Sequence, residues 1–269
     1  MVKIYLMRHG ESRYNEVQAN INPKDEYGKY MYDVESTKAR LMNLKKDSSL
    51  INCNVTDKGR NQSREAGTNF ENRPEIKHVA LSPMLRCIET FEGLFEDIIK
   101  NRPDALPKIK FFNESREILN ASCDLGIWNA DKKRNLLLNN YDWKEIDSNP
   151  LWFLDSLCQR KRDQILENFS EDMDFDEKVK VMLEFFSKFE PEKRFEDYNV
   201  IRERLEIFRK NLKEYCVKNN VQDGELMVIS HSRTLQTLTC TEFNTRDKPV
   251  DGKFVFFKNA QILEWNFDL

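Results

Sequence analysis

Three short apolar runs, each followed by polar residues, constrain the fold of this chain most strongly. They cover residues 2–7 (VKIYLM), 78–81 (HVAL) and 225–229 (ELMVI). A continuous apolar run of this length is typical of a parallel strand that is buried on both faces. Weaker strand candidates lie at 110–112, 254–257 and 262–265, the last of which would close the set. The runs therefore predict a mostly parallel sheet.

Helical patterns lie between these runs. One pattern begins at Thr56, a suitable N-cap, and runs toward Asn72. A second follows Pro83, and its apolar residues recur at helical spacing as far as Ile98. A third covers residues 197–219. Strands that alternate with helices predict an α/β fold, here a three-layer α/β/α sandwich around the mostly parallel sheet.

Two stretches, at about 18–54 and about 128–196, interrupt this alternation. Both contain aromatic and charged residues, and the chain has no fixed-period repeat and no Gly/Ser linker. A chain of 269 residues is long enough to bury a substantial core. We therefore expect a single domain over residues 1–269, with the two stretches as insertions that form a helical cap.

Composition excludes some classes of partner and compartment. The chain has 43 Lys and Arg against 46 Asp and Glu, so its net charge of -3 indicates neither nucleic-acid nor membrane binding. The six cysteines lack CxxC spacing and are expected to be reduced thiols. The apolar run at the N-terminus is too short for a signal peptide, and no stretch is long enough to span a bilayer. We expect a cytoplasmic protein.

Charged and polar residues at the ends of the predicted strands form the candidate site. Arg8 and His9 follow the first run, Arg86 follows the run at 78–81, and His231 follows the last. The carboxyl ends of parallel strands meet at one edge of the sheet, where ligands bind, so these residues should converge. Two arginines beside two histidines favour a multiply charged anion, and phosphate fits best.

Four segments resemble motifs of the histidine phosphatase superfamily, which includes phosphoglycerate mutases and fructose-2,6-bisphosphatases. They are 8–15 (RHGESRYN), 56–62 (TDKGRNQ), 82–90 (SPMLRCIET) and 228–232 (VISHS), in the family's order. A fifth segment, 115–126 (SREILNASCDLG), is more similar to a plant and fungal phosphoglycerate-mutase-like branch than to true mutases.

The resemblance implies that His9 attacks phosphorus and becomes a phosphohistidine. The ring must then be neutral, and Arg8 and Arg86 should lower its pKa through like-charge repulsion. Arg8, Arg86 and His231 would hold the phosphoryl oxygens on which charge accumulates. This chemistry implies no metal ion and no other cofactor.

The leaving alkoxide needs a proton, and the resemblance implies that a glutamate in this part of the chain supplies it. Glu117 is the candidate general acid, and Glu114 is its rival three residues earlier. Cys123 and Asp124 are expected to position the loop that contains Glu117 rather than to act in catalysis.

Three further residues are candidates for binding substrate. Ser12 and Asn15 belong to the first motif, and Asn15 is a plausible donor to the phosphoryl group. Arg233 stands where relatives usually have a glycine or another small residue. One hypothesis is that Arg233 reaches a second anionic group of the substrate, and the alternative is an arginine on a helix surface.

These observations predict a metal-independent phosphatase that hydrolyses a phosphate monoester of a small metabolite through a phosphohistidine. A phosphoglycerate mutase would use the same intermediate, and a phosphoprotein phosphatase would bind proteins through the aromatic residues of 128–196. A catalytically inert binding module is disfavoured because the whole set of site residues is intact. The expected partner is a small phosphorylated substrate, with no nucleic acid and no membrane, and the oligomeric state and the identity of the substrate stay open.

Overall fold

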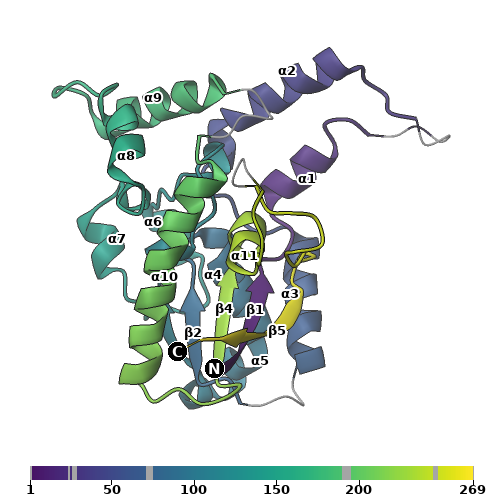
Figure 1. The fold of residues 1–269 in the computed structure, drawn as a ribbon, viewed down its shortest axis with the longest axis vertical. Coiled ribbons are helices and arrows are strands. Elements are labelled where there is room, and N and C mark those ends of the chain that lie inside the picture. Colours follow the sequence, from purple (N-terminus) through teal and green to yellow (C-terminus); the bar gives the residue numbers. More distant parts are fainter. Residues whose placement is uncertain are drawn as a thin grey trace.

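The structure, a computed structural model, describes residues 2–23, 25, 29–70, 75–189, 195–244 and 248–268. Within these residues the centre is a five-stranded sheet of order β3-β2-β4-β1-β5 (Figure 1). The strands are β1 (Val2–Arg8), β2 (His78–Leu81), β3 (Lys108–Phe111), β4 (Leu226–Ser230) and β5 (Ile262–Phe267). The four strands β1, β2, β3 and β4 are parallel to one another, and β5 runs antiparallel to β1. The predicted mostly parallel sheet is therefore confirmed.

One of the weaker strand predictions is wrong, and another is shifted. β3 begins two residues before the predicted run at 110–112. The run at 254–257 forms no strand. There the Val255 N–H donates to Thr239 Oγ1 at 3.2 Å, and the Phe257 carbonyl accepts from Arg8 Nη1 at 3.0 Å. These backbone groups bond to side chains and are not available for a strand ladder.

Helices cover both faces of the sheet, which makes the predicted three layers. In Figure 1, α10 (Tyr198–Lys218) and α11 (Ser232–Leu238) lie in front of the sheet, and α4 (Leu85–Leu94) and α5 (Glu96–Asn101) lie behind it. Alternate residues of a strand point to opposite faces. Ile4 and Leu6 of β1 therefore share a core cluster with residues of α10 and α11, whereas Tyr5 and Met7 share one with residues of α4.

Helix ends follow the capping residues of the sequence. α3 (Asp57–Phe70) begins after Thr56, whose hydroxyl accepts from the Gly59 N–H at 3.1 Å. The predicted end near Asn72 lies outside the described residues. α10 matches the predicted helix at 197–219, with the side chain of Asp197 as its N-cap.

The pattern between Pro83 and Ile98 forms two helices where the sequence suggested one. α4 begins two residues after Pro83. α5 follows after a break at Phe95, whose φ of -107° and ψ of 19° leave the helical region. Periodicity alone cannot detect this break, because the apolar residues keep helical spacing across it.

The remaining elements lie mostly in the two predicted insertions. The helices are α1 (Arg13–Ala19), α2 (Val34–Lys45), α6 (Ala130–Arg134), α7 (Lys144–Ser148), α8 (Gln159–Leu166) and α9 (Phe175–Ser187). Short 3₁₀ turns are η1 (Ser48–Leu50), η2 (Pro103–Ala105), η3 (Asn113–Ser115), η4 (Ser122–Asp124) and η5 (Trp152–Leu154). α2 and α9 contact each other beyond the carboxyl ends of β1 and β4 (Figure 1). That they act as a cap of a single domain stays a prediction.

Two smaller expectations can be compared with the described residues. All six cysteines are free, in line with their spacing. None of the helices among the described residues is long and apolar enough to cross a membrane.

Candidate active site

A pocket of about 260 Å³ lies at the carboxyl ends of the parallel strands. The predicted site residues that line it are Arg8, His9, Ser12, Asn15, Arg86, Glu117 and Arg233. They come from β1, α1, α4, α11 and the loop after β3, so only the tertiary fold brings them together. His231 is buried directly beside this group, with its ring centroid 5.2 Å from that of His9.

His9 is held in one tautomer by its own chain neighbour. The side chain is only 4% exposed, and its Nδ1 lies 2.7 Å from the carbonyl oxygen of Gly10. A carbonyl only accepts, so Nδ1 of the neutral ring carries the proton and Nε2 keeps its lone pair. The Gly10 N–H donates to Thr90 Oγ1 at 2.9 Å and ties this turn to α4. The sequence did not identify this carbonyl.

Burial and nearby charges keep His9 neutral. Burial lowers the pKa of the His9 imidazole well below 6.5, and Arg86 and Arg8 lower it further. The sequence predicted the direction correctly but named only the arginines, whereas loss of hydration is the larger cause. A neutral imidazole with a free Nε2 can act as a nucleophile near neutral pH.

His231 connects Arg86 to the strand end of β2. Arg86 Nε donates to His231 Nδ1 at 3.2 Å, so Nε2 of the neutral ring carries the proton and donates to Ser82 Oγ at 2.8 Å. Burial, followed by Arg86, lowers the pKa of His231 well below 6.5. The ring does not line the pocket, and in this structure it orients Arg86. Its contact with a phosphoryl group stays a prediction.

Arg86 is anchored by Cys123 and Asp124, two residues that the sequence did not pair with it. Its Nη1 donates to the Cys123 carbonyl at 2.6 Å, and its Nη2 donates to Asp124 Oδ1 at 3.3 Å. Burial raises the pKa of Asp124 to about 6, although Arg86 acts in the opposite direction. Cys123 and Asp124 therefore hold the guanidinium of Arg86. Asp124 Oδ2 also accepts from the N–H groups of Asn120 at 3.2 Å and Ala121 at 3.0 Å, so Asp124 positions the loop that contains Glu117 as well, as predicted. The pairing joins residues 38 positions apart and leaves no local sequence signal.

Arg8 keeps part of its hydrogen-bonding capacity unused. Its Nη1 donates to the Phe257 carbonyl at 3.0 Å. Its buried Nε has no hydrogen-bond partner among the residues that the structure describes. An unpaired buried donor is costly, and a bound anion would supply the acceptor.

The structure distinguishes the two candidate acids. Glu117 lines the pocket, and its carboxylate accepts from the N–H groups of Ile118 at 3.0 Å and Arg233 at 3.3 Å. Glu114 does not line the pocket, and its carboxylate accepts from Asn211 Nδ2 at 2.8 Å. Of the two glutamates, Glu117 therefore lies at the pocket, and its role as the general acid stays a prediction.

Arg233 lies at the pocket on the first turn of α11. Its Nη1 donates to Gln236 Oε1 at 3.0 Å and to the Tyr198 hydroxyl at 3.4 Å. No ion pair of Arg233 occurs within the described part of the chain, so its charge is not balanced by a direct carboxylate partner. The sequence did not single out Gln236, although its position three residues after Arg233 on a helix is a detectable signal.

Ser12 and Asn15 have a structural task besides lining the pocket. Ser12 Oγ accepts from the Asn15 N–H at 3.3 Å, and Asn15 Oδ1 accepts from the Ser12 N–H at 3.2 Å. This reciprocal pair is a capping box at the start of α1. A substrate contact of either residue stays a prediction.

The charges around the pocket suit an anion. Arg8, Arg86 and Arg233 face two carboxylates, Glu117 and Asp124, and the excess is positive. Guanidinium groups match the geometry of phosphate oxygens. Within the described residues, no group of three or more His, Cys, Asp or Glu side chains is arranged to hold a metal ion.

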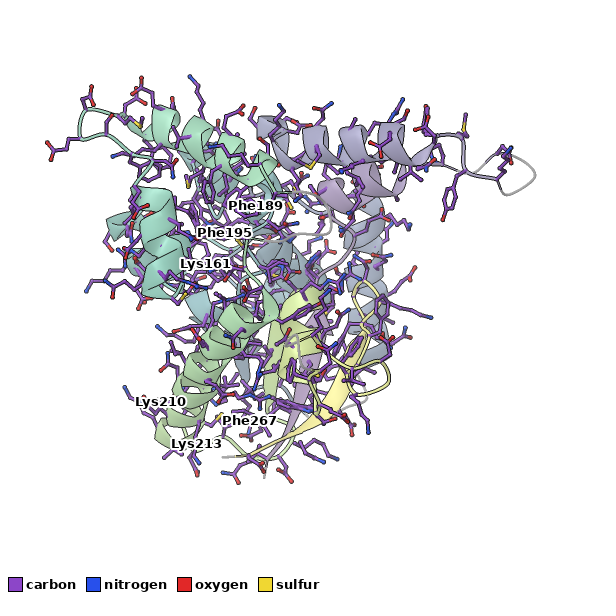
Figure 2. All side chains as sticks on the ribbon, turned by 45° about the horizontal axis from the view of Figure 1, so that its top comes forward. Lys161, Phe189, Phe195, Lys210, Lys213 and Phe267 are labelled. Carbon is purple, nitrogen blue, oxygen red and sulfur yellow. The ribbon has the colours of Figure 1, made fainter. Side chains whose placement is uncertain are left out.

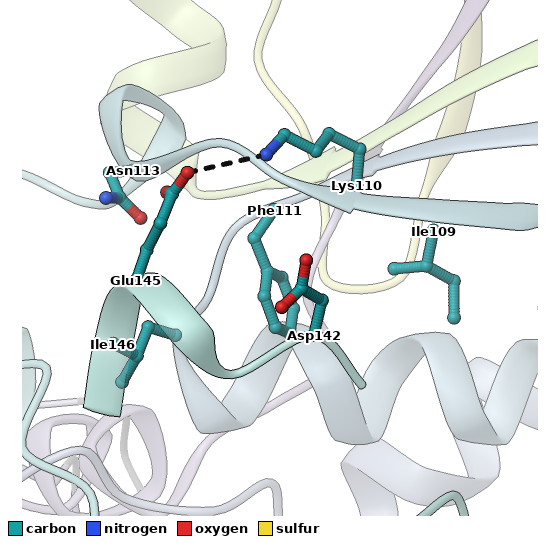
Figure 3. A pocket seen from close by; sticks show the side chains of 7 residues that line it. All are labelled: Ile109, Lys110, Phe111, Asn113, Asp142, Glu145 and Ile146. Carbon is teal, nitrogen blue, oxygen red and sulfur yellow. Dashed lines mark ion pairs between the residues drawn. The ribbon is translucent and has the colours of Figure 1, made fainter. Parts of the chain in front are cut away.

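A second hollow, at the edge of the sheet, differs from this pocket in volume and in charge. It measures about 50 Å³ and lies between β3 and α7 (Figure 3). Lys110 forms an ion pair with Glu145 there at 3.6 Å, so its positive charge is already balanced. The described residues that line it include no arginine and no histidine. It has neither the room nor the free charge of the pocket at the strand ends.

No protein-family model and no curated protein matches this chain. Among solved structures, it is similar to a phosphoglycerate mutase from Bacillus anthracis str. Sterne, with 15% identity over 98% of this chain and 86% of the other, at a TM-score of 0.46. A mycobacterial glucosyl-3-phosphoglycerate phosphatase is 13% identical over 98% and 90%, at 0.47. A phosphoserine phosphatase variant from Entamoeba histolytica, in complex with phosphoserine, is 13% identical over 100% and 92%, at 0.44. Likeness at this level assigns no substrate to this protein.

Proposed function

We propose that this protein hydrolyses a phosphate monoester of a small metabolite through a phosphohistidine at His9. The observation that supports this most directly is the state of His9. Its ring is neutral, its Nδ1–H is engaged by Gly10, and its Nε2 is left with a lone pair at a pocket that three arginines line. This combination of a nucleophile and a cationic clamp is what phosphoryl transfer requires.

The reaction would proceed in two steps. In the first, His9 Nε2 attacks phosphorus, the bond to the leaving oxygen breaks, and Glu117 donates its proton to that oxygen. In the second, a water molecule attacks phosphorus, Glu117 takes the proton of the water, and the bond to His9 breaks. Arg8 and Arg86 hold the phosphoryl oxygens while charge accumulates on them. The arginines supply the positive charge, so the proposal needs no metal ion.

The proposal includes a family and a feature of the substrate. The four motifs support membership of the histidine phosphatase superfamily, and segment 115–126 supports a position near its plant and fungal phosphoglycerate-mutase-like branch. Arg233 has no ion pair within the described residues and lines the same pocket as Arg8 and Arg86. We therefore expect a substrate with a second anionic group, which Arg233 would bind.

The test is release of inorganic phosphate from a panel of phosphorylated metabolites, together with labelling of the protein. The wild type should acquire an acid-labile, base-stable phosphoryl label, and His9→Ala should not. His78→Ala is the matched control, because His78 lies outside the pocket and bonds to the Tyr215 hydroxyl at 3.0 Å. Label in His9→Ala would contradict the proposal. Phosphate that stays on the product after phosphoglycerates are added would indicate a mutase.

A further inference from the structure

A cluster of three buried ions lies under the loop that contains Glu117. Arg116 and Glu196 are fully buried, and Arg204 is 2% exposed. Arg116 donates to both carboxylate oxygens of Glu196, at 2.6 and 3.1 Å, and Arg204 Nε lies 3.4 Å from Glu196 Oε1. None of the three lines the pocket. Buried ion clusters seldom add net stability, because dehydration offsets their attraction, so a role in specifying local geometry needs consideration.

The cluster holds the main chain on both sides of Glu117. Before it, the Arg116 carbonyl accepts from Arg204 Nη1 at 2.8 Å. At the residue itself, the Glu117 carbonyl accepts from Arg116 Nη1 at 2.8 Å. After it, the Leu119 N–H donates to Glu196 Oε2. The single carboxylate of Glu196 therefore bridges the residue before Glu117 and the second residue after it.

The side chain of Glu117 depends on this main-chain anchor. Thr234 Oγ1 donates to the Arg116 carbonyl at 2.7 Å and lies 3.4 Å from Glu117 Oε1. The carboxylate is thus fixed against α11, while the backbone beneath it is fixed by the ion cluster. A shift of about 1 Å in a catalytic group is enough to cost a large factor in rate.

One member of the cluster, Glu196, and one of its partners, Ser156, come from the 128–196 insertion. Ser156 Oγ accepts from Arg116 Nε at 2.8 Å. Glu196 follows Phe195, whose ring lies 5.7 Å from the Phe189 ring, with Lys161 Nζ 4.9 Å from its centroid (Figure 2). The residue directly before Glu196 is thus buried and packed within the insertion.

We propose that Glu196, together with Arg116 and Arg204, is a positioning residue that aligns the general acid Glu117, and that the 128–196 insertion acts on catalysis through it. This inference rests on the proposed function, because it assigns a task to the acid of that reaction. Glu196 itself touches neither the pocket nor the reacting atoms.

The inference makes a specific kinetic prediction. An alkoxide leaving group needs a proton from Glu117, whereas a nitrophenolate leaves without one. Loss of alignment should therefore slow hydrolysis of glycerol 2-phosphate and spare p-nitrophenyl phosphate. A merely structural role would lower both activities by the same factor.

The experiment compares Glu196→Gln with Glu92→Gln on these two substrates. Glu92 is 3% exposed and accepts from the Leu138 N–H and the Tyr141 hydroxyl, each at 3.1 Å, away from Glu117. Glu196→Gln should lower kcat/KM for glycerol 2-phosphate by about 10²-fold, and that for p-nitrophenyl phosphate by less than about 3-fold. Glu92→Gln should leave the ratio of the two values unchanged.

A double variant and a milder substitution complete the test. Glu196→Gln should cause no further loss on glycerol 2-phosphate once Glu117→Gln is present, and additive losses would overturn the inference. If Glu196→Gln fails to fold, Ser156→Ala decides: the same selective loss supports the inference, and equal loss on both substrates overturns it. Equal losses of Glu196→Gln on glycerol 2-phosphate and p-nitrophenyl phosphate overturn the inference. The proposed function stands in that case if the wild type is labelled at His9. A wild type without label or activity refutes the proposed function itself.

Discussion

The state of His9 makes a prediction about stability in acid. The ring is 4% exposed, and burial lowers its pKa well below 6.5 in the folded protein. In the unfolded chain the same ring takes up a proton near pH 6.5. Acidification therefore favours the unfolded state, and the stability that depends on a neutral His9 is lost as the pH falls below about 6.5.

The magnitude follows from the unfolded pKa alone. If the folded protein keeps His9 neutral, proton uptake by the unfolded chain costs about 0.2 kcal/mol at about pH 7 and about 1.4 kcal/mol at about pH 5.5. The wild type should thus lose up to about 1.2 kcal/mol more than His9→Asn over this interval. Asp124, whose pKa of about 6 is raised in the folded state, acts in the opposite direction. Its effect is common to both proteins and cancels in the comparison.

The assay is unfolding in urea at the two pH values, followed by tryptophan fluorescence. Between the two pH values, the free energy of unfolding should fall by up to about 1.2 kcal/mol more in the wild type than in His9→Asn. The wild type should likewise lose more than His231→Asn, because the His231 ring is also buried and has a lowered pKa. Equal losses in the wild type and His9→Asn would show that the folded protein protonates this ring. This result would refute the proposal that His9 attacks phosphorus as a neutral ring.

Three further substitutions test other parts of the site. Arg233→Ala should lower kcat/KM by about 10-fold or more on substrates with two anionic groups and much less on simple monoesters, and equal losses would rule out the second contact. Glu117→Gln should slow hydrolysis of alkyl phosphates by about 10²- to 10⁴-fold yet still label His9 from p-nitrophenyl phosphate, and loss of the label would contradict its role as the acid. Gly10→Ala should destabilise the fold by about 1–3 kcal/mol, because a Cβ there would meet the Gly59 carbonyl oxygen at 2.5 Å, and an unchanged urea midpoint would refute that contact.

The sheet was predictable because its signal is local. β1, β2 and β4 are continuous apolar runs, and their fully buried residues show why a strand covered on both faces has that pattern. The run at 254–257 has a similar composition but forms no strand, since the side chains of Thr239 and Arg8 bond to its backbone. Composition does not reveal such a competitor from another part of the chain.

The convergence of the candidate site residues was predictable from the sequence, whereas the groups that hold them in place were not. His9, Arg8 and Arg86 were found from their positions after strands, and they line one pocket. The carbonyl of Gly10 and the carboxylate of Asp124 were missed as partners of these residues, because each contact depends on the local turn or on a loop distant in sequence.

The sequence by itself determines which polar groups follow buried strands, because a strand that is buried on both faces needs an apolar run. It also determines that these groups share one edge of the sheet, because parallel strands direct their carboxyl ends to the same edge. Which donors and acceptors meet is decided only when the loops pack against that edge. His231 therefore accepts a hydrogen bond from Arg86, which is remote in sequence. Glu196 bonds to the loop of Glu117, although the two glutamates are 79 positions apart (196 minus 117). Hydrogen bonds act over about 3 Å, so partners remote in sequence become neighbours only through the tertiary fold.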